Sequence, residues 1–353
     1  MVSYNYSNFT VFGNESKGHR YAWAAWYIFL TITSLLGDTA ILLAAVKYKA
    51  FQLHKVIITF IQHIAVCDLI YSTTYLSYLP SSIISNRWTS GKALCYITAY
   101  TSFYFPLLGC LLICGMTVSK FLLLKYPLRS RSWTRKLVHK VCVGFWLASL
   151  YIPVALSIID TADVIFDNRV LFCRYGFSSR KWNLLKPITY VVVSFTPTLI
   201  VIAATTLLLL EGKKVVRGDG GHKQSLKWQG IVAVVLTATF NTLAKLPYMV
   251  YVIFEFLVKN GILSPGPFLE EFLRIALGTV GLNTISNFFI YSLTVRSFRA
   301  FLCIRIRVAT FRVTNTISRR EVRQGGLKGE YRREPLALVR LNMKIPADEV
   351  EEG

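Results

Sequence analysis

Residues 95–128 have the sequence CYITAYTSFYFPLLGCLLICGMTVSKFLLLKYPL. No charged side chain occurs within residues 93–119, and a helix needs roughly 20 apolar residues to cross a bilayer. The stretch begins at Cys95 and ends in a basic cluster that includes Lys120 and Lys125. It therefore predicts a membrane-spanning helix with a cysteine at one membrane surface and bases at the other.

The composition places the rest of the chain in the same class. Of 353 residues, 54% are hydrophobic and 16% are charged, whereas soluble domains carry about 25% charged residues. A globular core of buried helices is the competing interpretation, but too many apolar runs reach spanning length. The formal net charge of +22 is better explained by bases in loops beside the spans than by nucleic-acid binding.

Seven apolar segments predict an all-α membrane protein, a seven-transmembrane helix bundle. The predicted segments are 22–46, 56–79, 93–124, 138–159, 187–210, 229–256 and 268–294. An odd number of crossings places the two ends of the chain on opposite sides of the membrane. The predicted regions are an N-terminal region at 1–21, the bundle at 22–294, a membrane-surface helix at 295–303 and a tail at 304–353.

The N-terminal region carries three Asn-x-Ser/Thr glycosylation acceptors, Asn5, Asn8 and Asn14, and no other such triplet occurs in the sequence. Crowded acceptors indicate an extracellular N-terminus. Short loops on the other side are rich in Lys and Arg, while few bases, Lys259 and Arg274 among them, flank the outer loops. The short loops obey the positive-inside rule, and this agrees with the glycosylation side. The two signals together predict a multi-pass protein of the plasma membrane with its N-terminus outside.

Residues 295–303 have the pattern of a short amphipathic helix on the inner membrane surface. Apolar Phe298 and Phe301 recur at helical spacing with bases between them. Cys303 is a candidate palmitoylation site, and a plain free thiol is the alternative. The tail, residues 304–353, is basic and then acidic, and we expect it to be a disordered cytoplasmic segment.

Seven cysteines are present, and most lie within apolar runs, where buried thiols are inert. Cys95 and Cys173 lie instead at predicted loop edges on the same side of the membrane. They form a candidate disulfide if that side is oxidising. No cysteine spacing indicates a zinc site.

Short motifs in a fixed order carry a resemblance to a known family. They are Gly37-Asp38, Ile64-Ala65-Val66-Cys67-Asp68-Leu69, Trp88-Thr89-Ser90-Gly91 before Cys95, Trp146, Pro153, Pro197, Leu246-Pro247-Tyr248 and Asn287-Phe288-Phe289-Ile290-Tyr291. Together with the seven spans and the surface helix, this set resembles the rhodopsin-like (class A) G-protein-coupled receptors over residues 37–303. Each motif alone is weak, and the ordered set is strong.

The resemblance implies a cell-surface receptor that binds an extracellular ligand and signals through a heterotrimeric G protein by movement of the sixth helix. The expected G-protein interface is Lys120, Lys125, Pro127 and Leu128, although a topology signal alone also explains these bases. Pro247 and Tyr291 are the expected switch residues, because a proline kinks its helix and supplies a hinge. Phosphorylation of Thr314, Thr316 or Ser318 in the tail would recruit an arrestin.

The chain departs from the family pattern at the inner end of the third segment. The family has Asp-Arg-Tyr there, and this chain has Ser119-Lys120-Phe121. Lysine lacks the planar fork of arginine, and the acid that normally restrains the base is absent. We therefore expect no ionic latch between the third and sixth helices, and raised basal activity or unusual coupling. Lys245 replaces the sixth-helix Trp and Phe288 the seventh-helix Pro, which changes the usual activation switch.

A candidate polar core combines charged residues inside predicted spans with two asparagines: Asp38, Asp68, Lys245, Asn283 and Asn287. Intramembrane charges are costly and usually paired or functional. In the family, the position of Asp68 holds a sodium ion; Gly109 stands where the third helix would give a hydroxyl, so the site is incomplete, and no other cofactor or metal is expected. Either Lys245 supplies a fixed cation reaching toward Asp68, or it lines the ligand pocket or a water cavity.

The candidate ligand site lies between the outer halves of the third, sixth and seventh helices, where clefts open to solvent. Its residues are Ser102, Phe103, Phe105, Lys245, Tyr248, Met249 and Tyr251. Ordinary helix packing is the competing interpretation for each aromatic residue. Ser102 stands where amine receptors carry Asp, and the seventh segment has no lysine for a retinal Schiff base. A peptide or a small anion stays open, and Lys245 favours an anion.

Three other functions compete with a coupled receptor. A secondary transporter often shows internal repeats, and none is found between the halves of this chain. An enzyme would need a metal cluster, a nucleophile with its base or a phosphate loop, and the glycines at 218–221 are too short a motif for that. Within the family, a decoy that binds ligand without coupling is the alternative, because the acid and the Trp are absent.

Overall fold

The computed structural model describes residues 17–47, 54–126, 133–158, 163–167, 172–176, 195–218, 222–259, 262–264, 267–305 and 307–308. Residues 1–304 form one compact unit, and residues 305–353 form a second. The glycosylation acceptors Asn5, Asn8 and Asn14 and nearly all of the predicted tail lie outside the described residues. Glycosylation and the character of the tail therefore stay predictions.

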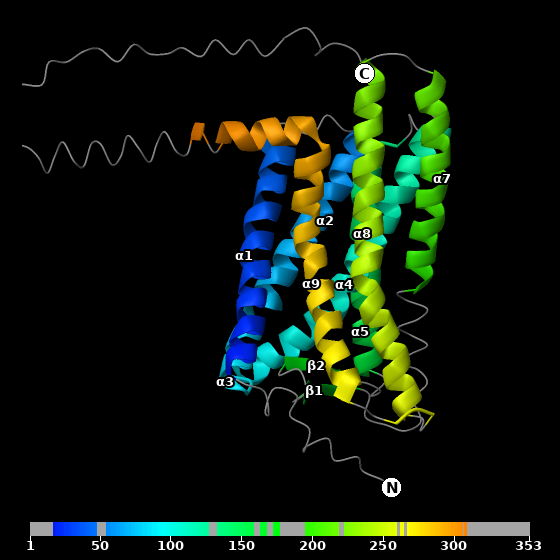
Figure 1. Ribbon diagram of the computed structural model, residues 1–353. Helices are drawn as coiled ribbons and strands as arrows, with labels where there is room; N and C mark the ends of the chain where they lie inside the picture. The colour runs from blue at the N-terminus through cyan, green and yellow to red at the C-terminus, as the bar shows by residue number, and fades with distance from the viewer. Residues whose placement is uncertain are drawn as a thin grey trace, which may run out of the picture. The chain divides into compact units, whose positions relative to one another are not determined.

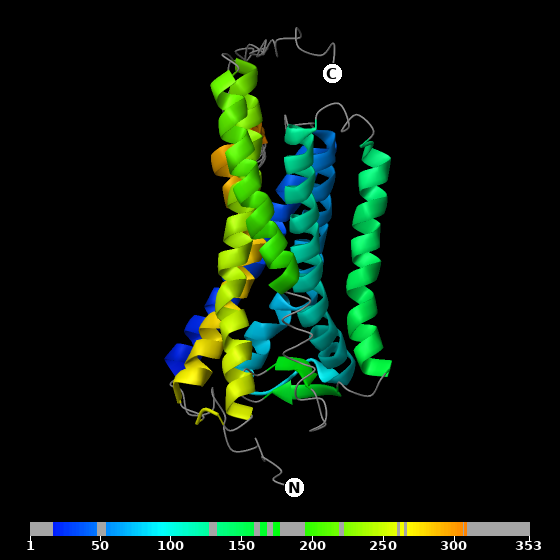
Figure 2. The ribbon, with the colours of Figure 1, turned by 90° about the vertical axis from the view of Figure 1, so that its right-hand side faces the viewer.

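Seven helical rods run side by side in the described part of the first unit (Figures 1 and 2). They are α1 (Lys17–Lys47), α2 (Lys55–Thr74) with its continuation η2 (Leu76–Tyr78) and α3 (Leu79–Ser85), α4 (Gly91–Lys125), α5 (Arg135–Ile158), α7 (Thr196–Gly218), α8 (His222–Lys259) and α9 (Pro267–Thr294). Five of these rods contain described stretches long and apolar enough to cross a membrane, and α7 contains a shorter one, Thr196–Gly212. The predicted seven-helix bundle is confirmed.

The second rod continues past residue 79, where the sequence analysis ended it. Pro80 lies in the first turn of α3, and a proline has no N–H to offer the preceding turn. The chain passes this point through the 3-10 turn η2 and then resumes as an α-helix. α3 ends at Asn86, whose φ of 52° is left-handed, a conformation that asparagine tolerates better than most residues.

The Trp-x-x-Gly motif forms the start of α4. Gly91 has a φ of +81°, which only glycine adopts without strain. The indole Nε1 of Trp88 donates a hydrogen bond to the carbonyl oxygen of Gly91 at 2.7 Å. The two ends of the motif therefore hold each other and set the direction in which α4 enters the bundle.

A short β-hairpin lies in the region that the sequence analysis treated as a loop. β1 (Asp163–Asp167) pairs antiparallel with β2 (Phe172–Gly176), and Phe166 lies opposite Cys173. Figure 2 shows the hairpin across the end of the bundle at which α4 begins. We call this end the disulfide end, for the bond described below, and the other the opposite end. The hairpin is an addition to the expected all-α fold.

The predicted amphipathic helix after the last span is confirmed. Residues 296–305 are helical, and the helix turns away from the axis of α9 (Figure 1). Phe298 and Phe301 are buried, whereas Arg296 and Arg299 are exposed. Phe298 packs edge-on against Phe288 of α9, with ring centroids 6.3 Å apart.

Two glycines permit close approach of helices that carry large aromatic rings. A Cβ placed on Gly37 of α1 would lie 2.7 Å from the Cβ of Phe288, the residue that stands where the family has a proline. A Cβ on Gly115 of α4 would lie 2.7 Å from Phe145 and 2.8 Å from Phe60. Interiors are close-packed, so neither contact leaves room for an added methyl group.

The indole of Trp146 joins α5 to α2. Its Nε1 donates to Nδ1 of His63 at 3.2 Å, so the other imidazole nitrogen of neutral His63 carries the proton. That nitrogen lies 2.9 Å from Nδ1 of His139. The fourth-helix Trp of the motif set therefore anchors α5 through a chain of polar contacts.

At the opposite end, His54 caps α2. Its Nδ1 accepts a hydrogen bond from the backbone N–H of Val56 at 3.4 Å. Burial lowers the pKa of His54 below 6.5, and the charges of Lys120 and Lys55 lower it further. The neutral imidazole, which is the form that can accept, is therefore favoured in the folded protein.

We expect the melting temperature of the purified protein to fall as the pH drops from about 7.5 to about 5, because the unfolded chain takes up the His54 proton before the folded one does. The contribution is fully present above the ordinary pKa and is lost as the pH falls through it. His54→Asn keeps a capping acceptor that does not titrate, so it should reduce this pH dependence. Identical pH profiles for His54→Asn and the wild type would contradict the assignment.

Candidate functional site

The predicted disulfide between Cys95 and Cys173 is present and fixes the cap of the bundle. The two Cα atoms are 5.2 Å apart, within the usual range for a disulfide. Cys173 is buried against Ala99, and Trp88 and Phe103 pack around the pair. The bond therefore ties β2 to the first turns of α4, over the end of the bundle where the ligand site is predicted.

Two predicted ligand residues lie on α4 close to this cap. Phe103 belongs to the cluster around the disulfide. Ser102 is partly buried, and its Oγ donates to the carbonyl oxygen of Ala99 at 2.8 Å. The hydroxyl is thus satisfied within its own helix and presents its acceptor lone pairs to the surroundings.

Phe105 is placed apart from the other predicted ligand residues. It is 6% exposed and packs edge-on against Tyr71 of α2 and Trp146 of α5, with ring centroids 6.3 Å apart in each case. These contacts direct the ring between α2 and α5. Phe105 therefore holds three helices together, as the competing packing interpretation states, and we leave it out of the candidate cleft.

Lys245 is the charged residue at the centre of the candidate site. Its side chain is 8% exposed, and its Nζ donates to the carbonyl oxygen of Pro106 at 2.9 Å. The bond joins α8 to α4 in the interior of the bundle. A charged donor makes a stronger hydrogen bond than a neutral one, so this contact is a firm link between the two helices.

Three further predicted residues follow Lys245 along α8 toward the disulfide end. Tyr251 and Met249 are buried, at 2% and 7% exposed, and Tyr248 is partly buried. The rings of Tyr248 and Tyr251 stack with centroids 6.1 Å apart. Of these three side chains, Tyr248 is therefore the most exposed, and it is the best placed to contact a ligand.

The first part of the polar core lies between α1 and α2. Asp38 is fully buried, and its Oδ2 accepts a hydrogen bond from Ser34 Oγ at 2.8 Å. Ser34 in turn accepts from Ser72 Oγ of α2 at 2.7 Å. Asp38 Oδ1 has no hydrogen-bond partner among the described residues, so the carboxyl is only half satisfied.

The second part joins α2 to α9. Asp68 is 5% exposed, and its Oδ2 accepts from Nδ2 of Asn287 at 2.9 Å. Asn287 Oδ1 has no partner within the described part of the chain. Asn283 is also buried, at 9% exposed. Of the predicted polar set, Asn287 is therefore the member that binds Asp68 directly.

The structure gives Lys245 a partner other than Asp68. Its Nζ donates to the carbonyl oxygen of Pro106, and no ion pair between Lys245 and Asp68 is found among the described residues. A Cβ added at Gly109 would meet no atom within 4 Å, so there is room beside α4. Replacement of sodium by Lys245 stays a prediction.

At the opposite end, Lys120 is 8% exposed and Ser119 is 2% exposed. Lys125 instead lies over the rings of Phe121 and Tyr126, at 5.4 and 5.6 Å from their centroids. The other predicted G-protein contacts, Pro127 and Leu128, lie outside the described residues. Cys303 is exposed, as a lipidation site must be, and its modification stays a prediction.

The predicted switch residues lie in α8 and α9. Pro247 is inside α8, two residues from Lys245. Tyr291 of α9 is buried, at 1% exposed, and α9 packs along α8. Movement of α8 about Pro247 would therefore disturb both the Lys245 contact and the surroundings of Tyr291.

Sequence reasoning missed several residues of the polar interior. Pro106 acts through its backbone carbonyl, and Ser34 and Ser72 bridge two helices. Arg274, which the sequence analysis placed at a loop edge, is buried at 8% exposed and pairs with Glu271 at 2.7 Å. Only Ser34 had a signal in the sequence: it lies four residues before Asp38, so both side chains lie on the same face of one helix.

Comparisons with known proteins agree with this arrangement. The family model described as 7 transmembrane receptor (rhodopsin family) matches residues 37–291. Lysophosphatidic acid receptor 4 of Homo sapiens is 29% identical over 265 residues, which are 70% of this chain and 68% of that receptor. Type-1 angiotensin II receptor A of Xenopus laevis is 22% identical over 303 residues, 81% and 80% of the two chains. C-X-C chemokine receptor type 2 of Oryctolagus cuniculus is 24% identical over 241 residues, 67% and 64%.

We expect Asn287→Ala to destabilise the protein by roughly 1.5–3 kcal/mol, the range for a hydrogen bond to a charged group. Thermal unfolding of the purified protein measures the change. Asn283→Ala is the matched control, because it removes a buried amide of the same helix, and it should cost less. In an Asp68→Asn background the cost of Asn287→Ala should shrink; an unchanged cost would show that the two residues are not coupled.

Proposed function

Because the chain belongs to the rhodopsin family of seven-transmembrane receptors, we propose that it binds an extracellular ligand at the disulfide end and activates a heterotrimeric G protein through movement of α8. The chain is a multi-pass membrane receptor and not an enzyme. The proposal places it in the plasma membrane with the disulfide end outside. The glycosylation acceptors near the N-terminus and the basic loops support that orientation.

The observation that carries the mechanism is the contact between Lys245 Nζ and Pro106 O at 2.9 Å. Each of these residues lies where a helix is locally weakened. Pro106 lies inside α4 and Pro247 inside α8, and a proline within a helix removes one backbone hydrogen bond. The ammonium therefore links two deformable backbones, and its release would free α8 to bend.

The proposed ligand carries a carboxylate or a phosphate. A lysine ammonium has three N–H donors, and one of them is assigned to a neutral carbonyl. An anion is a stronger partner for it than a carbonyl, so a ligand anion would compete for Lys245 and loosen α8 from α4. One relative is named for an acid, lysophosphatidic acid, while others are named for angiotensin II and for chemokines.

The proposed G-protein interface is the opposite end of α4. Lys120 is buried there beside Ser119, which stands where the family has an acid. Without a carboxylate beside it, Lys120 is less restrained in the resting receptor. The same substitution favours the second candidate function, a decoy that binds ligand without coupling. The family match argues against the transporter alternative.

We expect Lys245→Met to raise ligand-independent signalling by roughly tenfold or more, because a hydrogen bond to a charged group contributes roughly 1.5–3 kcal/mol. Methionine keeps the length of the side chain and removes the charged donor. The measurement is dissociation of G-protein subunits in cells without added ligand, normalised to receptor at the cell surface. The same variant should weaken activation by anionic agonists found in a ligand screen.

Lys140→Met is the control, because Lys140 is an exposed lysine on α5, and it should leave the basal signal unchanged. A basal signal for Lys245→Met equal to that of the wild type, at equal surface expression, would contradict the proposed role of the Lys245–Pro106 contact. If no heterotrimer responds to the wild type, to Lys245→Met or to any agonist that binds, the coupling proposal fails and the decoy is favoured.

We expect Ser119→Asp to lower basal signalling severalfold relative to Ser119→Asn, because only the aspartate supplies a partner charge to Lys120 in a site of low dielectric. The two substituents are nearly the same size, so the comparison isolates the charge. The assay is the same one, with surface expression measured in parallel. Equal signals from the two variants would show that loss of the acid does not set the basal level.

A further inference from the structure

Two histidines link α2 to α5 in the half of the bundle that lies away from the disulfide. The indole Nε1 of Trp146 donates to Nδ1 of His63 at 3.2 Å, and Nε2 of His63 lies 2.9 Å from Nδ1 of His139. α5 lies at the edge of the bundle (Figure 2) and packs against α4 and α2. The two imidazoles therefore belong to the contacts that hold a peripheral helix in place.

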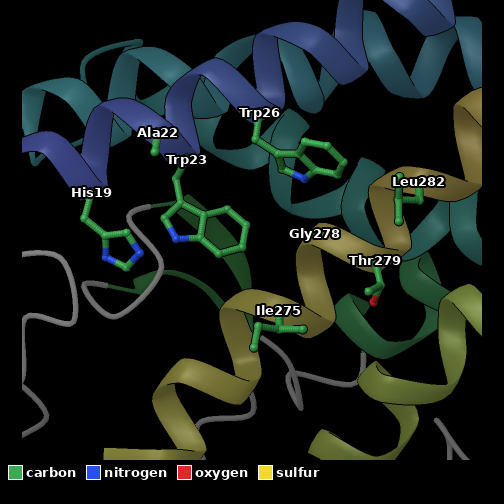
Figure 3. A pocket seen from close by; sticks show the side chains of 8 residues that line it. All are labelled: His19, Ala22, Trp23, Trp26, Ile275, Gly278, Thr279 and Leu282. Carbon is green, nitrogen blue, oxygen red and sulfur yellow. The ribbon is translucent and has the colours of Figure 1, made fainter.

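The contact between α1 and α9 is of a different kind. Trp23 and Trp26 project from α1 toward the stretch of α9 that carries Gly278 (Figure 3), and a Cβ on Gly278 would lie 3.0 Å from the ring of Trp23. Indole rings do not titrate between about pH 5 and pH 8, whereas histidine does. The packing of these indoles is therefore independent of pH, and the contact between the two histidines is not.

The directions of the hydrogen bonds fix where each proton lies. An indole Nε1 is a donor only, so Nδ1 of His63 accepts from Trp146 and Nε2 of His63 carries the proton. This N–H donates to Nδ1 of His139, which must therefore be unprotonated. Both imidazoles are neutral in this arrangement, and His139 carries its own proton on Nε2.

The arrangement has no place for an added proton. A proton on Nδ1 of His139 would point at the N–H of His63. If the proton of His63 moved to Nδ1 instead, it would point at the indole N–H of Trp146. Uptake of one proton therefore breaks one of the two hydrogen bonds, whichever imidazole takes it up. The same reasoning argues against a metal ion between the histidines, because the metal would take the lone pair of His63 Nε2 and force the proton onto Nδ1.

The nearest charges on α5 are positive and oppose a further positive charge. Arg135, Lys136 and Lys140 lie within four residues of His139. The guanidinium of Arg135 also donates to Oε1 of Gln62, the residue before the other histidine, at 3.2 Å. This second link between α2 and α5 does not titrate near neutral pH, because a guanidinium stays charged.

No carboxylate is placed to hold an imidazolium. α4 and α5 contain no Asp or Glu, and α2 contains only Asp68, which is joined to Asn287 of α9. Groups of ordinary Lys, Cys and Tyr chemistry are neutral or positive between about pH 5 and pH 7.5, and histidine is too. Those on or next to the three helices around the pair are His54, Lys55, Cys67, Tyr104, Cys110, Cys114, Lys120, Lys125 and Cys142.

Water can deliver a proton to the pair. His139 is exposed, as are Lys136 and Lys140 on either side of it. A lysine is costly in hydrocarbon, so this level of α5 lies at the membrane surface. His139 is also only roughly 6 Å from the start of α5 at Arg135, at 1.5 Å per residue. The proposed function places this end in the cytoplasm, and only that choice of compartment rests on it.

We propose that His63 and His139 form a pH-sensitive link between α2 and α5, closed when both imidazoles are neutral and opened by uptake of one proton. The link is closed at about pH 7.5 and opens as the pH falls toward about 5, the range in which histidine titrates. The bond between Arg135 and Gln62 persists, so α5 is loosened and not released. Acidification on this side of the membrane thus loosens α5, without any ligand.

The test is hydrogen exchange of the purified receptor in nanodiscs, read on peptides that cover residues 135–146 and corrected for the intrinsic exchange rate at each pH. All variants carry His54→Asn, because the cap at His54 has a pH dependence of its own. Between about pH 7.5 and about pH 5.5, protection of these peptides should fall roughly three- to tenfold, the ratio expected when one hydrogen bond is lost.

Two substitutions at the exposed His139 separate titration from packing. His139→Asn keeps an acceptor at the position of Nδ1 that does not titrate, so protection should stay high at both pH values. His139→Ala removes the acceptor, so protection should be low at both. His19→Gln is the control, because His19 is an exposed histidine on α1, and it should reproduce the fall seen without it.

A second measurement observes the protons directly. Nitrogen-15 NMR of the histidine-labelled receptor at about pH 7.5 should show the signal lost in His63→Asn as a neutral ring with its proton on Nε2. A proton on Nδ1 of His63 at this pH overturns the proposal. So does unchanged protection of residues 135–146 on acidification, or an equal fall in His139→Asn and in the receptor that keeps His139.

Discussion

The hydrocarbon core of a membrane offers no hydrogen-bond partner, so each polar side chain buried there must find one within the protein. This constraint explains the interior of the receptor. Asp68 is joined to α9 by Asn287, Asp38 to α2 through Ser34 and Ser72, and Lys245 to α4 through Pro106. These three links connect five of the rods, and each crosses between elements that apolar packing alone would leave free to slide.

The same constraint shows why the sequence predicted the rods well and the links poorly. A long charge-free run such as residues 93–119 is stable as a helix in the hydrocarbon core of a membrane, so the spans and their order can be predicted from composition. The acceptor of Lys245 is a backbone carbonyl, which every residue possesses and no pattern reveals. The charged member of a link is visible in the sequence, and its partner usually is not; Asn287 was found only because a motif marked it.

Local exceptions follow from equally physical causes. The hairpin of β1 and β2 escaped prediction because its strands have only five residues each, and a disulfide rather than a sequence pattern holds β2 to α4. Arg274 was assigned to a loop edge because a lone base beside a span usually lies there. Its pairing with Glu271 one turn away neutralises the charge and allows burial. Phe105 was assigned to the ligand site by its position along α4, but its direction around the helix points to α2 and α5.

Two departures from the family pattern, Ser119 in place of an acid and Lys245 in place of a Trp, both affect how α8 is held in the resting receptor. A bond between α4 and α8 at the opposite end of the bundle would act far from the bend at Pro247, whereas the Lys245 contact acts two residues from it. From Lys245 to the start of α8 at His222 the helix extends roughly 35 Å at 1.5 Å per residue. A small rotation at the bend therefore moves the end of α8 at His222 several times further than it moves Lys245. A restraint near the bend must be short-ranged and strong to hold the resting state, and a charged donor on a buried carbonyl meets that requirement. In the proposed mechanism, the restraint on α8 therefore lies beside the bend at Pro247, at the Lys245–Pro106 contact, and not at the end of α8 that begins at His222.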